Sequence, residues 1–280
     1  RNLATAPWPY RLRDAEAFLA QPRDPVLPSF LIFERTNGAP NLVGSCGLGR
    51  RPSGAVELGY WVGRNHWGRG YATEAGTALI DIARTLGFPV VRVQISLTPD
   101  DMERLLPVAE QYDVRLGLEI HSHQHPRHPA IQALLERYEK LGSPHLGFVP
   151  DWGASLTAVP TTLLRKYRAA GYEEELLEAL ETTWQEHHRE GPPQTEQQHG
   201  RWFGQVMQLA HQHGAGDRAI EMAVNLTGLF GHAPVSDWAD VLPWTVHTHA
   251  KFYEIDADGD ERMVAIFDND GPLWRRVGEQ

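Results

Sequence analysis

Three segments of the chain share one design, in which an apolar, strand-like stretch ends at an acidic or imidazole side chain. They are residues 114–125, 145–153 and 244–253. In the first of them apolar residues alternate with other types, which is the period of a strand, and Glu119 stands near the end. The carboxyl ends of parallel strands lie on one face of a β/α sheet. We therefore expect Glu119, Asp151 and His249 to converge, although they are far apart in sequence.

The residues of these segments also resemble a known family. G-L-E-I-H-S, L-G-F-V-P-D-W-G and V-H-T-H-A-K-F-Y look like the ligand-bearing strands of the sugar phosphate isomerase/epimerase family, which are xylose-isomerase-like TIM barrels. The resemblance covers about residues 89–258. It implies a divalent metal, Mn²⁺, Mg²⁺ or Zn²⁺, bound by Glu119, Asp151 and His249. His249 is preferred to His247 because it heads the H-x-K element.

The activity that this resemblance implies is metal-dependent isomerisation or epimerisation of a sugar or sugar phosphate. The metal would stabilise an enediolate while Glu119 moves the proton. A TIM barrel needs eight β/α units and about 250 residues, whereas residues 89–258 span 170 positions. We therefore expect an incomplete barrel with a helical insertion at 161–240 and activity near background. Open sheet edges would favour self-association.

The N-terminal part has a different pattern. Apolar runs at 29–34, 41–50 and 56–62, joined by turn residues, predict an antiparallel meander. The last run leads into a glycine-rich turn and then a helix that ends near Leu86. A strand, a glycine turn and a helix N-terminus can hold an anionic group on backbone N–H groups.

The segment V-E-L-G-Y-W-V-G-R-N-H-W-G-R-G-Y-A-T-E-A resembles the acetyl-CoA loop of GNAT N-acetyltransferases. The resemblance covers residues 1–88 and implies an acetyl-CoA cofactor, with Glu57 as the base that deprotonates the acceptor amine. The implied pyrophosphate contacts are Gly68, Arg69, Gly70, Tyr71 and Ala72. Acetyl transfer is therefore the alternative function. A non-catalytic mosaic fragment is the third interpretation.

The C-terminal segment M-V-A-I-F-D-N-D-G-P-L-W resembles the first motif of haloacid-dehalogenase-like phosphatases. Residues 261–280 are too few for the rest of such a fold, so we expect no phosphatase activity. The predicted organisation is an α/β chain with three parts. They are a partial GNAT-like mixed sheet at 1–88, an incomplete TIM-barrel-like region at 89–260 and a short tail at 261–280.

The composition of the chain excludes several classes of binding partner and site. The net charge of −10 argues against nucleic acid, whose binding draws on clustered Lys and Arg. Cys46 is the single cysteine, which excludes an internal disulfide and a multi-cysteine zinc site. No apolar run approaches the roughly 18 residues that span a membrane, so a cytoplasmic protein with a small-molecule partner is expected. Four histidines in one loop are expected to form a polar surface: His121, His123, His125 and His128.

Overall fold

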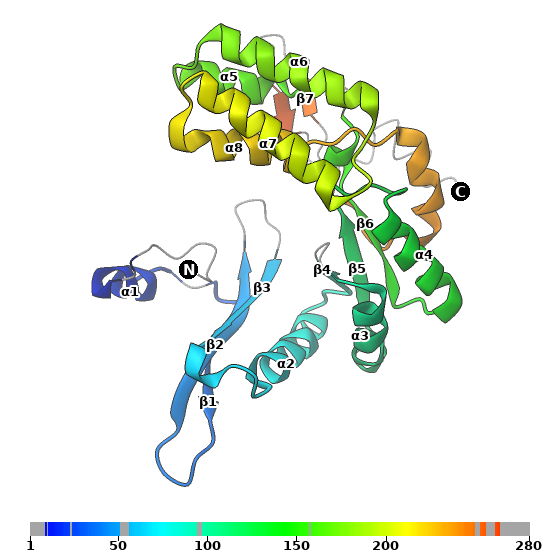
Figure 1. Ribbon diagram of the computed structural model, residues 1–280. Coiled ribbons are helices and arrows are strands. Elements are labelled where there is room, and N and C mark those ends of the chain that lie inside the picture. The colour runs from blue at the N-terminus through cyan, green and yellow to red at the C-terminus, as the bar shows by residue number, and fades with distance from the viewer. Residues whose placement is uncertain are drawn as a thin grey trace. The chain divides into compact units, whose positions relative to one another are not determined.

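The computed structural model of the chain (Figure 1) divides into two compact units. Unit 1 comprises Arg1–Pro89 and Gln111–Val114, and unit 2 comprises Val90–Glu110 and Arg115–Gln280. The structure describes residues 9, 11–22, 24–50, 56–93, 97–156, 158–249, 253–255 and 261–263. Both units contain helices and strands, as the predicted α/β class requires.

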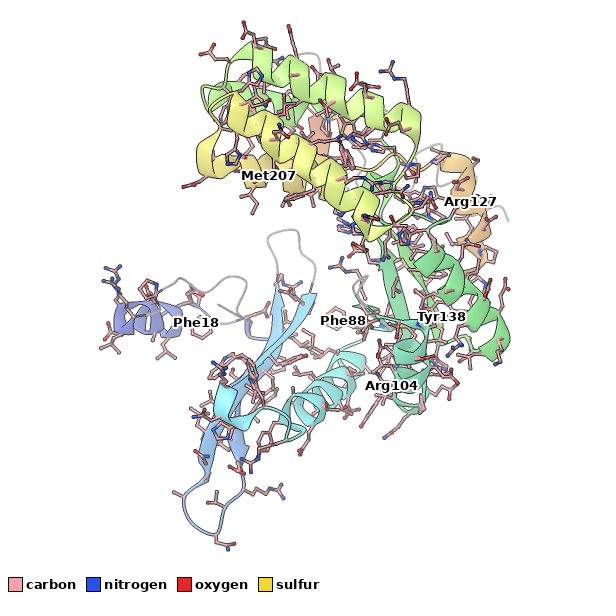
Figure 2. The ribbon with its side chains drawn as sticks, viewed as in Figure 1. Phe18, Phe88, Arg104, Arg127, Tyr138 and Met207 are labelled. Atoms are coloured by element: carbon pink, nitrogen blue, oxygen red, sulfur yellow. The ribbon has the colours of Figure 1, made fainter. Side chains whose placement is uncertain are left out.

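Unit 1 is built on a three-stranded antiparallel sheet. Its strands β1 (Ser29–Glu34), β2 (Asn41–Arg50) and β3 (Val56–Val62) are hydrogen-bonded in that order, which confirms the predicted meander. Helix α2 (Tyr71–Thr85) contributes Leu79 and Ala83 to a small core shared with the sheet. The short helix α1 (Leu12–Leu19) buries none of its residues, and Phe18, labelled in Figure 2, is 58% exposed.

The turn before α2 depends on glycine. Gly70 precedes the first helical residue with φ of 84°, and Gly68 has φ of 74°. L-residues with a side chain rarely adopt this left-handed region, because Cβ then approaches the following carbonyl oxygen. A 3₁₀ turn, η1 (Arg64–His66), connects β3 to these glycines.

Unit 2 contains the parallel sheet expected from the three segments. Strands β4 (Val90–Val93), β5 (Arg115–Ile120) and β6 (Leu146–Pro150) lie in that order, and helices α3 (Pro99–Gln111) and α4 (Pro129–Leu141) connect them. Tyr138 of α4, labelled in Figure 2, packs against Phe148 of β6 with ring centroids 5.0 Å apart. The face of the sheet that α4 covers is therefore apolar and buried, and Ile131 and Leu134 of α4 are buried there as well.

A further segment extends this sheet in the same direction. Parallel bridges join Phe148 to Thr245 and Asp151 to His249. The close approach requires glycine, because a Cβ atom on Gly147 would lie 2.4 Å from the carbonyl oxygen of Trp244. The third of the predicted segments, 244–253, is thus present as a bridged segment as far as His249. Within the described ranges the sheet forms no closed barrel.

A layer of helices separates β6 from this segment in sequence, as Figure 1 shows in green to yellow. Its helices are α5 (Thr161–Ala169), α6 (Glu174–Glu190), α7 (Glu196–Gln212) and α8 (Ala219–Val224), followed by the π-helical turn Asn225–Leu229. Their apolar faces share a core that includes Leu177, Trp184 and Trp202. The predicted helices are present, and their interpretation as an insertion at 161–240 stays a prediction.

Short elements complete the described chain. They are the 3₁₀ turns η2 (Trp152–Ala154), η3 (Gly216–Arg218), η5 (Val235–Asp240) and η6 (Leu242–Trp244), and the hairpin of β7 (Tyr253–Ile255) and β8 (Glu261–Met263). No helix in the described ranges is both long and apolar enough to cross a membrane. The haloacid-dehalogenase-like motif at 263–274 lies outside the described residues, apart from Met263.

Candidate functional site

The ends of two adjacent strands hold the acidic pair of unit 2. Glu119 is the fifth residue of β5 and pairs in register with Val149 of β6, and Asp151 follows the last residue of β6. Both carboxylates are buried, at 4% and 1% exposure. Carboxylates are almost never fully buried without a charged partner or a metal, so this burial marks a specialised site.

His249 faces both carboxylates. Its Nδ1 atom lies 2.7 Å from Oε1 of Glu119 and 3.3 Å from Oδ2 of Asp151. The parallel bridge between Asp151 and His249 fixes this approach, because the backbone N–H of His249 donates to the carbonyl of Pro150 at 2.8 Å. The structure therefore brings together the three residues that the sequence analysis selected. The neighbouring His247 is exposed instead.

Arg92 is a further member of the site that the sequence analysis missed. It lies on β4, is exposed, and forms an ion pair with Oε1 of Glu119. Burial acts to raise the pKa of Glu119, but the hydrogen bond from His249 and the charge of Arg92 lower it below its ordinary value overall. Glu119 is consequently a stable carboxylate. The available signal was a single charge inside the apolar run V-V-R-V.

The donor set suits a divalent cation. One ligand atom from each of Glu119, Asp151 and His249 lies within 4.8 Å of the other two. Two carboxylate oxygens and one imidazole nitrogen match the preferences of Mn²⁺, Mg²⁺ and Zn²⁺. His121 adds a second imidazole nearby, with Nε2 at 3.8 Å from Oδ2 of Asp151.

The histidine loop after β5 is not the polar surface that was expected. His125 and His128 are buried, at 2% and 6% exposure, and His121 and His123 are half-buried. Burial lowers the pKa of His125 to about 4, with the nearby His128 as the second cause. The expectation was wrong because the helical layer supplies partners for this loop, which loop composition alone does not reveal.

Unit 1 has a separate hollow at the predicted acetyl-CoA loop. It has a volume of about 600 Å³ and is lined by the turn and by the end of β3, including Trp61, Trp67 and the predicted contacts Gly68 to Ala72. The N-terminus of the 15-residue helix α2 adjoins it. Backbone N–H groups at such a terminus favour an anionic ligand.

Two of the predicted contacts have their side chains turned to Glu34. Arg69 forms an ion pair with Glu34, and the Tyr71 hydroxyl donates to Glu34 Oε1 at 2.6 Å. Glu34 ends β1, and the sequence analysis missed it because nothing local to residues 63–75 indicates that strand. The predicted base Glu57 lies on β3, exposed and opposite Gly49.

Comparison with protein families concerns the first half of the chain. Residues 1–139 match the family described as acetyltransferase (GNAT) domain. A protein from Bacillus licheniformis, named uncharacterized N-acetyltransferase p20, is 37% identical over 62 residues, which is 21% of this chain and 34% of that protein. The resemblance to GNAT proteins is supported, and the matched region extends beyond the predicted boundary at residue 88.

Further relatives are named deglycosidase alpha subunits. The 3'-dehydrocarminate deglycosidase alpha subunit of Microbacterium sp is 50% identical over 192 residues, 69% of this chain and 55% of that protein. The C-glycoside deglycosidase alpha subunit of Arthrobacter globiformis is 50% identical over 189 residues, 68% of this chain and 52% of that protein. The chain thus spans about half the length of these relatives.

These findings correct the predicted activity. The prediction of a metal-dependent sugar isomerase or epimerase is wrong, because the relatives are deglycosidase subunits and the matching family is an acetyltransferase. The comparisons likewise give no support to the resemblances to isomerase barrels and to haloacid-dehalogenase-like phosphatases. Carboxylates and an imidazole at strand ends specify a polar site, whereas the reaction depends on surroundings that a short motif does not describe.

Proposed function

We propose that unit 2 carries a deglycosidase-type site for a C-glycoside, centred on Glu119, Asp151 and His249. An uninterrupted stretch of 192 residues in a chain of 280 includes residues 89–192 wherever it begins. Glu119 and Asp151 fall inside that range, so the half-identical region includes the two buried carboxylates. Their convergence with His249 is the observation that carries the proposal.

The proposed site includes a divalent metal held by these three side chains. When bound, such an ion polarises a carbonyl oxygen of the substrate. The name of the Microbacterium relative specifies a 3'-dehydro glycoside as substrate, and the prefix denotes a sugar in which a hydroxyl group is oxidised to a ketone. A ketone-bearing glycoside is thus the substrate class that a cation at this position suits best.

The side chains of this chain have separable roles in the proposal. Glu119 stays ionised because His249 and Arg92 stabilise its charge, so it can bind a cation or accept a proton. Asp151 is oriented by its own turn, since the backbone N–H of Gly153 donates to Oδ1 at 2.9 Å and leaves Oδ2 toward His249. Arg92, itself exposed, balances the charge of the buried Glu119 carboxylate.

Binding of 3'-dehydrocarminate in the presence of Mn²⁺, measured by calorimetry, tests the proposal. We expect saturable binding by the chain and at least a tenfold loss of affinity in Asp151→Asn. Asp100→Asn, which alters a carboxylate that is 80% exposed and paired with Arg137, is the matched control and should bind normally. Equal binding by Asp151→Asn and the unaltered chain would contradict the site.

A second function is supported for the first half of the chain. We infer that the hollow beside α2 binds acetyl-CoA, because the family match includes it and its glycine turn presents backbone N–H groups to an anion. Acetyl transfer to an amine, with Glu57 as base, follows as the accompanying activity. If the chain binds acetyl-CoA but does not acetylate amines, the proposed cofactor site stands and the proposed role of Glu57 as the base is wrong.

Association with another polypeptide completes the proposal. The relatives are named alpha subunits, and β4 is an edge strand of the parallel sheet among the residues described. Edge strands offer unpaired backbone groups to other chains. Light scattering is expected to show a species larger than the 31.5 kDa monomer, and a monomer at all concentrations would exclude self-association. A cytoplasmic location stays an expectation.

A further inference from the structure

A second cluster of donor side chains lies in unit 2, apart from the three residues of the first site. His123 belongs to the loop after β5, and Glu196 and His199 belong to the first turn of α7. One donor atom from each lies within 4.8 Å of the other two. Two segments more than 70 positions apart therefore supply one compact group of donors.

Contacts within the cluster are close. Nε2 of His123 lies 2.7 Å from Oε1 of Glu196, and the rings of His123 and His199 stack with centroids 3.8 Å apart and planes 13° apart. Glu196 and His199 are three positions apart on α7, which places both on one face of the helix. The two stacked rings and the carboxylate thus bring three donor atoms into one compact group.

The surroundings of His199 select one of its ring nitrogens. Nε2 of His199 lies 3.2 Å from the carbonyl oxygen of Thr227, and a carbonyl only accepts, so Nε2 carries the hydrogen. Nδ1 is then left as the unprotonated nitrogen. Thr227 is fully buried in the π-helical turn. Ligating histidines in metal sites are held in this way, with the second nitrogen donating to a backbone carbonyl.

A buried imidazole beside the cluster also points to a ligand. His128 is 6% exposed, and its ring centroid lies 6.2 Å from that of His123. Nε2 of His128 is buried and has no hydrogen-bond partner among the described residues. Buried polar atoms are nearly always paired with protein, water or an ion. A polar ligand at the cluster would give this nitrogen a partner.

We propose that His123, Glu196 and His199 form a second cation site, which takes a divalent transition metal such as Zn²⁺. Two imidazoles and one carboxylate are the His₂Glu set of zinc sites that keep a position open for water or substrate. Glu196 is 73% exposed and His123 only 12%, so the site has a solvent side and a protein side. Imidazole-rich ligand sets favour Zn²⁺ and Co²⁺ over Mg²⁺, which distinguishes this site from the carboxylate-rich one.

Titration with Co²⁺, followed by visible absorption, tests the proposal in full-length Glu119→Gln, where the first site is disabled. We expect one Co²⁺ per chain with the absorption of a low-coordinate complex, and displacement by Zn²⁺. Glu196→Gln and His199→Ala should each weaken binding at least tenfold. His213→Ala is the matched control, because His213 is the exposed residue that ends the same helix.

Each outcome decides the proposal. Glu196 is exposed, so Glu196→Gln keeps the fold even if His199→Ala disturbs it, and its circular dichroism should match the parent. Unchanged Co²⁺ affinity in folded Glu196→Gln would overturn the site. So would an equal loss in His213→Ala, since that result indicates nonspecific binding to surface histidines. Loss in folded Glu196→Gln, with unchanged affinity in His213→Ala, supports it.

Discussion

Nδ1 of His249 lies 2.7 Å from Oε1 of Glu119, and 130 positions of sequence separate the two residues. The contact exists because β5, β6 and the bridged segment after Trp244 run parallel, so that their carboxyl ends meet. Helices α4 to α8 occupy the intervening sequence without displacing the strand ends. The parallel topology of the sheet therefore brings the three side chains of the site together.

Mn²⁺ is expected to stabilise the folded chain through Glu119, Asp151 and His249. An ion present at about 100 times its dissociation constant adds about 2.7 kcal/mol to the free energy of unfolding, because it binds only the folded state. Urea denaturation with and without Mn²⁺ measures this gain in the Glu196→Gln background, which disables the second site. Glu119→Gln should lose the gain and Asp100→Asn should keep it. A gain of equal size in all variants would contradict the assigned ligands.

Gly147→Ala should weaken metal binding although Gly147 is no ligand. Its new Cβ would lie 2.4 Å from the carbonyl oxygen of Trp244 and 2.5 Å from a methyl group of Val246, so the segment that carries His249 must shift. We expect at least a tenfold loss of Mn²⁺ affinity, measured by calorimetry. Gly49→Ala, a strand position with open space around its Cβ, is the control. Unchanged affinity in Gly147→Ala would show that the bridge does not position His249.

Much of this arrangement could be predicted from the sequence. The alternation around Glu119 and the apolar runs before Asp151 and His249 identify strands, and parallel order follows from the helices between them. The run V-V-R-V marks Arg92 as an unusual charge, but its pairing with Glu119 depends on the register of β4 against β5 and not on local sequence. The burial of His125 and His128 was missed for a similar reason. It depends on a helical layer that begins more than 30 positions later.

Gly70→Val should impair acetyl-CoA binding by unit 1. Gly70 has φ of 84° in open space, so the cost of the change is backbone strain and not a clash. A β-branched residue is expected to cost about 2 kcal/mol or more in this region, and the turn should rearrange. Calorimetry with acetyl-CoA should show at least a tenfold loss. Gly76→Ala inside α2 keeps the turn and should bind normally, and equal losses in both variants would indicate general destabilisation of the helix.

Acid should destabilise unit 2 through His232. This imidazole is 4% exposed between Trp184 and Trp202, and both ring nitrogens are without partners in the described part of the chain. Burial lowers its pKa to about 3, with His188 and His187 as lesser causes. The unfolded chain binds the proton near pH 6.5 and the folded chain does not, so stability is greatest above that pH and falls between about 6.5 and 3.

His232→Phe isolates this effect, since it fills the site with a ring that does not titrate. The loss of unfolding free energy between about pH 7 and about pH 4 should shrink by on the order of 3 kcal/mol relative to the unaltered chain. Urea denaturation at the two pH values measures it, with His213→Phe as the exposed control. An unchanged pH dependence in His232→Phe would assign the acid sensitivity to other groups.

The three strand-end motifs could not specify which reaction the site catalyses. Glu, Asp and His at strand ends predict a cation and a polar substrate, and several chemistries share those requirements. The isomerase prediction rested on three short segments, whereas a relative that is 50% identical over 192 residues is named a deglycosidase alpha subunit. The identity of the substrate depends on residues around the strand ends that no single segment reveals.

Electron paramagnetic resonance of bound Mn²⁺ tests the central claim most directly. The full chain in the Glu196→Gln background, loaded with one Mn²⁺, would be titrated with 3'-dehydrocarminate. A ketone that reaches the ion changes its coordination, so the account predicts a saturable change in the Mn²⁺ spectrum that Asp100→Asn retains and Glu119→Gln lacks. A Mn²⁺ spectrum that 3'-dehydrocarminate leaves unaltered, or that changes equally in Glu119→Gln, would contradict a deglycosidase-type site at Glu119, Asp151 and His249.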